Sequence, residues 1–180
     1  MRVNAEDTMA IIIDFQEKLL PVMDQKEALI QKAATFAQGL VELEVPFVVS
    51  QQYTRGLGET VSELKDVIAD GTYLEKNTFS CMGCEEIKNW VVAQGKKNVL
   101  ISGIEAHICV MQTVVDLLEM GYNVTVVADC VGSRSQYDKE IGLERMKAEG
   151  AKVATCESIL FELTVGAKNP HFKTISKLVK

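Results

Sequence analysis

Apolar residues follow two alternating patterns along this chain. Short apolar runs, typical of strands buried on both faces of a sheet, alternate with longer segments whose apolar residues recur every three to four positions, as on an amphipathic helix. The runs, with a weaker candidate at 72–75, predict strands at 8–14, 47–49, 72–75, 99–101, 122–128 and 151–155. The helical spacing predicts helices at 27–41, 59–68, 85–93, 108–118, 139–149, 158–163 and 172–179.

The alternation of six strands with helices predicts the fold class. It indicates a single domain over 1–180, built as a three-layer α/β/α sandwich with a six-stranded, mainly parallel, Rossmann-like sheet. The 180 residues suffice for one substantial core and are too few for two ordinary domains. Right-handed crossovers bring the carboxyl ends of parallel strands to one edge, where such sheets bind ligands. Functional residues are therefore expected where strands end.

Three residues with complementary chemistry follow the predicted strands at this edge. Asp14 follows the first strand and Lys76 the third, while Cys109 follows the fourth after a Ser-Gly pair at 102–103 that predicts a tight turn. A carboxylate can accept a thiol proton, an ammonium can stabilise the developing anion, and a thiolate can attack a carbonyl carbon. Taken singly, the same residues are explained as a capping acid, a surface lysine and a buried thiol.

The predicted turn places Cys109 in the first turn of a helix. The unpaired N–H groups and the positive end of the helix dipole there favour a thiolate over a thiol. The same N–H groups can stabilise an oxyanion. A catalytic Cys109 is therefore expected to ionise below the ordinary thiol pKa of about 8.5, whereas a structural one is expected to be inert.

Charge and motif content narrow the classes of partner. The net charge of −6 and the isoelectric point near 5.0, without a stripe of Lys and Arg, argue against nucleic acid. No apolar run approaches the roughly 18 residues of a membrane span, and the first residues lack a signal-peptide pattern, so we expect a cytoplasmic protein without a membrane partner. No glycine-rich phosphate-binding motif follows a strand, and no cofactor is expected.

The five cysteines indicate free thiols, because their number is odd and no secretory feature accompanies them. Cys81 and Cys84 form a C-M-G-C motif, a spacing found in zinc and redox sites. The two histidines, His107 and His171, are not paired at ligand spacing, so zinc is not supported. A dithiol oxidoreductase that uses Cys81 and Cys84 remains an alternative.

The chain resembles the isochorismatase-like hydrolases, a superfamily that includes nicotinamidases and N-carbamoylsarcosine amidases. The motifs that carry the resemblance are I-I-I-D-F-Q at 11–16, Q-Q-Y-T-R-G-L-G at 51–58, E-K-N-T-F-S at 75–80, S-G-I-E-A-H-I-C-V at 102–110 and A-D-C-V-G-S-R-S at 128–135. The resemblance implies a six-stranded parallel sheet and an Asp-Lys-Cys triad, here Asp14, Lys76 and Cys109. It also implies a cis peptide bond between Ile104 and Glu105 and a homo-oligomer, for which the terminal helix from Phe172 is a candidate contact surface.

Departures from the family pattern sharpen the prediction. Nicotinamidases carry an Asp-x-His metal site after strand two, whereas this chain has Q-Q-Y at 51–53, so no metal is expected. The presence of Cys109 favours hydrolysis of amides or related carbonyl compounds over the vinyl-ether cleavage of true isochorismatases. Backbone N–H groups of the turn at Ile104 and Glu105, and of Cys109 itself, are the expected oxyanion hole.

Four further residues are candidate substrate contacts. Gln52 and Tyr53 lie in a loop that is predicted to overhang the strand ends, where polar groups can orient a substrate. Phe15 follows Asp14, and Phe79 comes three residues after Lys76, so both are candidates for an apolar wall. Solvated loop positions and core packing are the structural alternatives.

Together these features predict a metal-independent cysteine hydrolase of the isochorismatase family. Its substrate is expected to be a small molecule with a non-peptide C–N bond, cleaved through an acyl-enzyme. Asp14 is expected to act first as a base toward Cys109 and then as an acid to the leaving group, while Lys76 balances the charge. The alternative is a binding or scaffold protein of the same fold with a redox-sensitive thiol.

Overall fold

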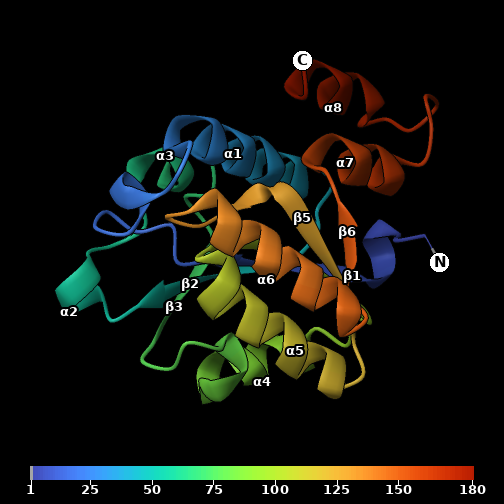
Figure 1. The fold of residues 1–180 in the computed structure, drawn as a ribbon. Coiled ribbons are helices and arrows are strands. Elements are labelled where there is room, and N and C mark those ends of the chain that lie inside the picture. The colour runs from blue at the N-terminus through green and yellow to red at the C-terminus, as the bar shows by residue number, and fades with distance from the viewer. Residues whose placement is uncertain (1) are drawn as a thin grey trace.

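A six-stranded sheet lies between two layers of helices (Figure 1). The computed structural model describes residues 2–180. Its strands are β1 (Thr8–Ile13), β2 (Phe47–Gln52), β3 (Thr72–Lys76), β4 (Asn98–Ile104), β5 (Asn123–Gly132) and β6 (Lys152–Ala154). All neighbouring strands pair in parallel, in the order β3-β2-β1-β4-β5-β6, which confirms the predicted α/β sandwich.

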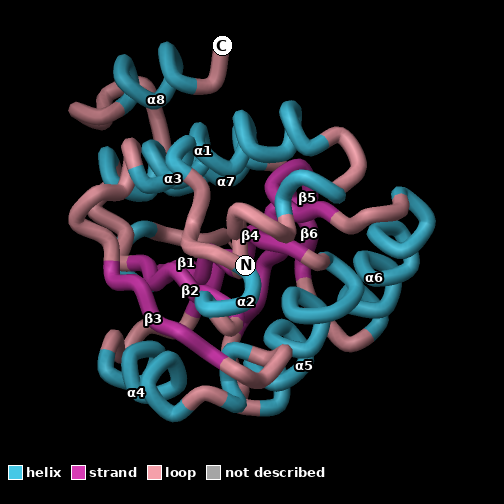
Figure 2. The backbone as a smooth tube through the Cα atoms, turned by 90° about the vertical axis from the view of Figure 1, so that its left-hand side faces the viewer, coloured by secondary structure: helices cyan, strands magenta, loops and turns pink. Residues whose placement is uncertain are grey.

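The helices divide between the two faces of the sheet (Figures 1 and 2). One face is covered by α1 (Lys26–Glu42), α3 (Ser62–Lys65), α7 (Cys156–Thr164) and α8 (Phe172–Leu178). The other is covered by α4 (Glu85–Ala93), α5 (Met111–Glu119) and α6 (Gln136–Ala148). The short helix α2 (Thr54–Leu57) lies in the loop after β2, and single 3₁₀ turns occur at Ala5–Asp7, Leu20–Val22 and Cys81–Gly83.

The central strand β1 shows why the sheet strands are apolar at consecutive positions. Ala10 and Ile12 belong to the core beneath α1 and α7, whereas Ile11 and Ile13 belong to the core beneath α4 and α5. All four are fully buried. Because successive side chains of a strand point to opposite faces, a strand covered on both sides must be apolar at every position.

The tight turn predicted at 102–103 is wrong, because β4 continues through both residues to Ile104. Gly103 has φ 150°, and a Cβ built there would lie 2.4 Å from the Cβ of Ile13. The glycine therefore allows close approach of β1 and does not end the strand. The chain turns at Glu105 and enters a π-helical turn, Ala106–Val110, that continues into α5.

Other predicted boundaries also differ from those observed. The helix expected over 59–68 is reduced to α3, which spans four residues. β5 extends beyond its apolar run to Gly132, because a register shift relative to β4 between Ile101 and Gly103 lets the two strands pair again. Asp129 therefore lies within β5 and not at its end.

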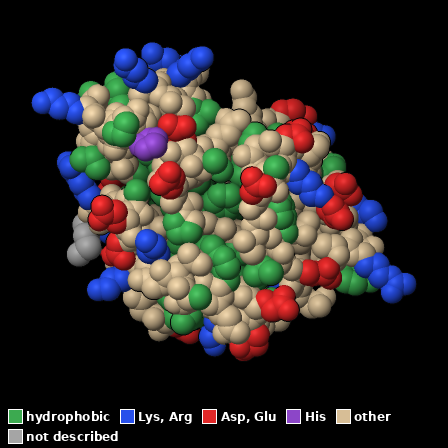
Figure 3. Space-filling model, turned by 180° about the vertical axis from the view of Figure 1, so that it is seen from behind, with side chains coloured by type: hydrophobic (Ala, Val, Ile, Leu, Met, Phe, Trp, Pro, Cys, Tyr) green, Lys and Arg blue, Asp and Glu red, His purple; other side chains and the backbone are tan. Residues whose placement is uncertain are grey.

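The terminal helix α8 packs its apolar residue inward. Ile175 is fully buried in the core shared with α1 and α7. Basic side chains gather at this end of the molecule (Figure 3); the exposed lysines of this segment are Lys168, Lys173, Lys177 and Lys180. A contact surface built on α8 is therefore basic on its outer side, and the proposed homo-oligomer contact there remains a prediction.

Candidate active site

Asp14 and Lys76, which are 62 residues apart in sequence, form a buried ion pair at the carboxyl edge of the sheet. The Nζ atom of Lys76 lies 2.7 Å from Oδ2 of Asp14. Asp14 directly follows β1, and Lys76 is the last residue of β3. Asp14 is 0% and Lys76 is 1% exposed, so water solvates neither charge. The strand-end rule correctly predicted that these two residues meet.

The second carboxylate oxygen of Asp14 is bound by a residue of the neighbouring strand. The hydroxyl of Ser50 donates to Oδ1 of Asp14 at 2.7 Å. Ser50 lies on β2 opposite Ile13, so the strand register places it beside the carboxylate. The backbone N–H of Asp14 also donates to the carbonyl of Ser50 at 3.1 Å. Both oxygens of Asp14 therefore have fixed partners, which orients the carboxylate.

Four oxygen atoms surround the ammonium of Lys76. Besides Asp14, it donates to Oε1 of Gln52 at 2.6 Å and to the carbonyls of Phe79 at 3.0 Å and Thr78 at 3.2 Å. Burial opposes the positive charge, but the nearby Asp14 and two cysteines more than offset it, so the pKa of Lys76 is raised. Lys76 is therefore a charged, immobilised cation at neutral pH.

Cys109 completes the cluster from the π-helical turn after β4. It is 7% exposed, which makes it the most accessible of the three residues. Burial, together with the charge and hydrogen bonding of Asp14, raises the pKa of Cys109 to about 12, while Lys76 acts in the opposite direction. The expected thiolate is thus a thiol in the resting site, because desolvation and Asp14 outweigh Lys76 and the helix terminus.

The turn that carries Cys109 is held at both of its ends. The peptide bond between Ile104 and Glu105 is cis, at the position that the resemblance implies. The carbonyl of Glu105 accepts hydrogen bonds from Ile108 at 3.0 Å and Val110 at 3.2 Å. The Glu105 carboxylate pairs with Arg134 at 2.8 Å, across the loop that follows β5.

Thr113 joins this turn to the loop that follows Lys76. Its hydroxyl donates to the carbonyl of Cys109 at 2.7 Å and accepts the backbone N–H of Cys81 at 2.9 Å. Thr113 is fully buried, so neither group has water as a substitute partner. The two segments that supply the cation and the thiol are therefore fixed relative to each other.

The chain is similar to known proteins over most of its length. A family model described as the isochorismatase domain matches residues 8–158, a span that contains Asp14, Lys76 and Cys109.

The chain belongs to the isochorismatase family.

Its similarity to other members extends over almost the whole chain. It is 37% identical to the secreted isochorismatase effector Isc1 of Phytophthora sojae, over 99% of this chain and 87% of that protein. It is 36% identical to isochorismatase domain-containing protein 2 of Danio rerio, over 99% of this chain and 89% of that protein. The solved structure of MAR1 ribonuclease from Caenorhabditis elegans superposes with a TM-score of 0.94 at 34% identity, over 99% and 92% of the two chains.

The four predicted substrate contacts occupy different environments in this isochorismatase domain. Phe15 is fully buried within the hydrophobic core, so it is not on an accessible wall. The Gln52 amide is committed to Lys76 and, at 3.2 Å, to the carbonyl of Asn77. Tyr53 and Phe79 are 48% and 57% exposed at the ends of β2 and β3. Only the last two are available for contact with a ligand in this conformation.

The cysteines of the C-M-G-C motif lie in unlike surroundings. Cys81 is fully buried; burial raises its pKa to about 11, and the charge of Asp14 acts in the same direction. Cys84 is half-buried and directs its thiol to the carbonyl of Glu75 at 3.5 Å. All five cysteines are free thiols. Cys81 therefore belongs to the surroundings of the triad, a position that the motif spacing did not indicate.

The two histidines each bond to one protein side chain. Among residues 2–180, no group of three or more His, Cys, Asp or Glu side chains is arranged to hold a metal ion. His107 and His171 are instead bonded through Nδ1, to Ser133 and Glu42 respectively, each at 2.9 Å. No helix within the described part of the chain is long and apolar enough to cross a bilayer. Cytoplasmic localisation and metal-independence remain predictions from the sequence.

Proposed function

We propose that this isochorismatase-family protein is a cysteine hydrolase that cleaves a C–N bond in a small amide or related carbonyl compound. The observation that carries the proposal is the buried pair of Asp14 and Lys76 beside the thiol of Cys109, the most exposed of the three residues. A buried ion pair is weak evidence for stability, because desolvation offsets much of its attraction. A carboxylate and an ammonium fixed beside a nucleophile fit a catalytic role.

In the first half of the reaction, Asp14 acts as the general base. Because the pKa of Cys109 is about 12, roughly one thiol in 10⁵ is ionised at pH 7. The proton therefore passes to Asp14 as the sulfur attacks the carbonyl carbon. Backbone N–H groups of Cys109 and of the turn at Ile104 and Glu105 are the proposed donors to the tetrahedral oxyanion.

In the second half, the same carboxyl group works in reverse. The C–N bond breaks, protonated Asp14 gives its proton to the leaving nitrogen, and a thioester remains on Cys109. Asp14 then takes a proton from water, which attacks the thioester, and Cys109 leaves as the thiol when the proton returns. Lys76 is charged throughout, so it keeps the carboxylate ionised between these steps.

The exposure of the site suggests a small substrate. Cys109 is the most exposed of the three residues, at 7%, and the exposed rings of Tyr53 and Phe79 lie in the loops that follow β2 and β3. We propose that these two rings contact the substrate. Gln52 acts on substrate only indirectly, because its amide positions Lys76.

A second candidate function comes from the C. elegans relative, which is described as a ribonuclease. An RNA-cleaving site needs access for a sugar-phosphate backbone and usually basic residues that bind it. This chain carries a net charge of −6, and Asp14 and Lys76 are almost wholly enclosed. These features favour the small-molecule hydrolase, and RNA is included in the test below.

The test combines turnover with detection of the acyl-enzyme. The wild-type protein is assayed with a panel of small primary amides and ureides and with a fluorogenic RNA, and intact-protein mass spectrometry follows substrate addition. We expect turnover of at least one amide and an acyl adduct that maps to Cys109. Cys109→Ala should abolish both signals and Asp14→Asn should lower turnover by about 10² or more, whereas the matched control Cys84→Ala should retain both.

Three outcomes would reject the proposal. These are wild-type turnover by Cys109→Ala, an adduct that maps to another cysteine, and hydrolysis of RNA without hydrolysis of any amide in the panel. If iodoacetamide alkylated Cys81 and Cys84 in preference to Cys109, the result would instead support a dithiol oxidoreductase. An inert Cys109 without turnover would support the binding-protein alternative.

A further inference from the structure

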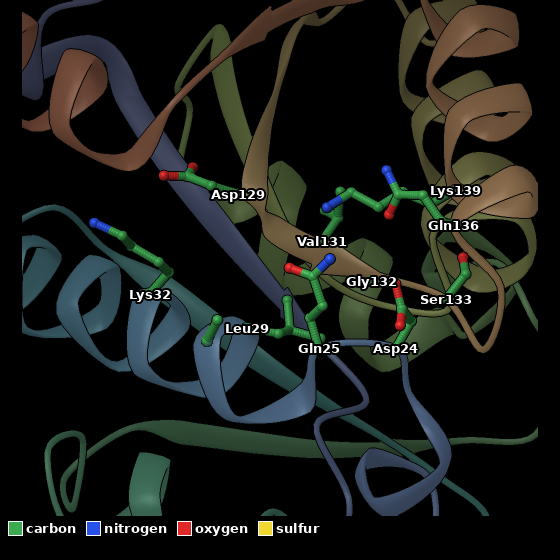
Figure 4. Close-up of a pocket in the computed structure, with 11 residues that line it drawn as sticks. Asp24, Gln25, Leu29, Lys32, Asp129, Val131, Gly132, Ser133, Gln136 and Lys139 are labelled. Atoms are coloured by element: carbon green, nitrogen blue, oxygen red, sulfur yellow. The ribbon is translucent and has the colours of Figure 1, made fainter.

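A cavity of about 250 Å³ opens between α1, the end of β5 and the first turn of α6 (Figure 4). None of Asp14, Lys76 and Cys109 lines it. At about 30 Å³ for each water molecule, its volume equals roughly eight waters, which is room for a ligand of about ten non-hydrogen atoms. The cavity is therefore separate from the triad and large enough for a small metabolite.

Lys139 of α6 reaches into this cavity without a protein partner. It is half-buried, and no carboxylate among residues 2–180 lies within ion-pair distance of its ammonium. Burial lowers the pKa of Lys139, while Asp129, Cys130 and Asp24 act in the opposite direction. Figure 4 shows the side chain directed toward that of Gln25 across the cavity. A partly desolvated ammonium without a bonded anion gains from an anionic ligand.

The acidic residues of the cavity also retain bonding capacity. One oxygen of Asp129 accepts the N–H of Cys156 at 2.7 Å, which leaves its other oxygen available. Within residues 2–180, the Asp24 carboxylate makes no hydrogen bond or ion pair, and neither does the ammonium of Lys32 at the other end of the cavity. Figure 4 shows Asp24 and the Lys139 ammonium on one side of the cavity, whereas the side chains of Asp129 and Lys32 point toward its other end.

Gln25 adds an uncommitted amide. It is the N-cap residue of α1, yet its side chain makes no capping hydrogen bond. Its backbone has φ 49°, in the left-handed region that residues other than glycine rarely adopt. Such backbone outliers are often found at ligand sites, where the surrounding structure holds them. The amide is therefore available to bond a ligand instead of the helix.

We propose that this cavity is a second binding site, for a small zwitterion of the amino-acid class. Lys139 binds the ligand's carboxylate, and Asp24 binds its ammonium. The amide of Gln25 bonds to either group. A ligand with a single charge leaves either Lys139 or Asp24 without a partner, so a zwitterion matches this pair better than a simple anion or cation.

The cavity is also joined to the turn that carries the nucleophile. Ser133, which is 1% exposed, lines the cavity, and its hydroxyl lies 2.9 Å from Nδ1 of His107. His107 and Cys109 share the π-helical turn. The carbonyl of Ser133 accepts the N–H of Asp24 at 2.9 Å, so the cavity wall and the turn form one hydrogen-bonded unit.

Calorimetric titration tests the proposal without relying on catalysis. Each of the twenty standard amino acids is titrated into wild-type protein and into Cys109→Ser, which leaves the cavity unchanged; acetate and methylammonium are the single-charge probes. We expect at least one amino acid to bind both proteins with millimolar or lower Kd. Acetate and methylammonium should bind at least about tenfold more weakly, as loss of a charge-assisted contact predicts.

Variants of the wall locate the bound ligand. Lys139→Met should weaken binding by about tenfold or more, whereas Lys147→Met, at an exposed position of the same helix, should leave it unchanged. Asp24→Asn, at the exposed rim, provides a second variant that is not expected to disturb folding. Four results overturn the proposal: no binding by any amino acid, equal binding of acetate, wild-type affinity in both wall variants, or loss of binding in Cys109→Ser.

Discussion

Replacing Asp14 with asparagine should make Cys109 more reactive toward an alkylating agent while it strongly reduces turnover. The wild-type pKa of Cys109 is about 12, and Asp14 raises it both by its charge and by accepting a hydrogen bond. Asparagine removes the charge and leaves Lys76 as the only neighbouring full charge of the triad. Because a charge in contact typically changes a pKa by about 1 to 3, we expect the pKa of Cys109 to fall to about 9 to 11.

The magnitude follows from the fraction of thiolate. At pH 8 that fraction is about 10⁻⁴ for a pKa of 12 and about 10⁻³ to 10⁻¹ for a pKa of 11 to 9. Since the thiolate is the reactive form, iodoacetamide should label Cys109 about 10 to 1,000 times faster in the variant, and less as intrinsic nucleophilicity falls with pKa. Turnover should fall by about 10² to 10⁴, because the general base is lost.

The assay is iodoacetamide labelling between pH 6 and pH 11, read by peptide mapping, beside turnover of the substrate identified in the amide panel. The wild-type labelling rate should rise with pH up to the highest values, whereas that of Asp14→Asn should level off earlier. Asp66→Asn, which removes an exposed carboxylate, is the control and should match wild type. Unchanged or slower labelling of Cys109, or retained turnover, would refute the assignment of Asp14 as the base.

Four further results are expected. Lys76→Met leaves the buried Asp14 carboxylate without its cation and should lower the free energy of unfolding in urea by about 3–5 kcal/mol. Thr113→Val removes the hydroxyl that bonds the Cys109 carbonyl, which should cost about 1–3 kcal/mol in the same assay and reduce kcat. Gly103→Ala puts a methyl group against β1 and should destabilise the fold by about 1–3 kcal/mol or more. Treatment with EDTA should leave turnover unchanged, because the triad supplies base, cation and nucleophile without a metal.

Matched variants separate these effects from nonspecific ones. Lys65→Met breaks an exposed ion pair and should change the urea midpoint little. Thr174→Val, at an exposed position of α8, and Gly166→Ala, where a Cβ meets nothing within 4 Å, should behave like wild type. Equal loss of stability in a variant and its control would remove the structural explanation offered for that residue, and loss of turnover in EDTA would contradict metal-independence.

The residues at the strand ends were predictable because the argument needed only chain order and parallel pairing. Carboxyl ends of parallel strands meet at one edge whatever their order, so Asp14 and Lys76 could be placed together from sequence. The residues that bond to Asp14 and Lys76 could not be predicted in the same way. Ser50 touches Asp14 only because β2 pairs with β1 in one register, and hydrophobic runs specify which segments are strands without specifying that register.

Two errors in the sequence-based predictions have identifiable physical causes. A Ser-Gly pair after an apolar run is as typical of a turn as of a strand with a close neighbour, and only the position of Ile13 shows that Gly103 serves the second purpose. The pKa of Cys109 depends on its burial and on contact with Asp14, which is 95 positions earlier in the sequence. A helix terminus can be recognised from sequence, but an opposing carboxylate so remote in sequence cannot.

The distribution of the triad over three separate strands has a consequence for folding. Asp14 follows β1, Lys76 ends β3, and Cys109 follows β4, while β2 lies between the first two strands in the sheet. No segment shorter than residues 14–109 contains all three groups, and their contacts join residues far apart along the chain. Contacts of this kind form late, because closing long loops is entropically unfavourable. Recovery of the proposed hydrolase activity during refolding should therefore report when strands β1 to β4 have assembled, and helix formation alone should not restore it.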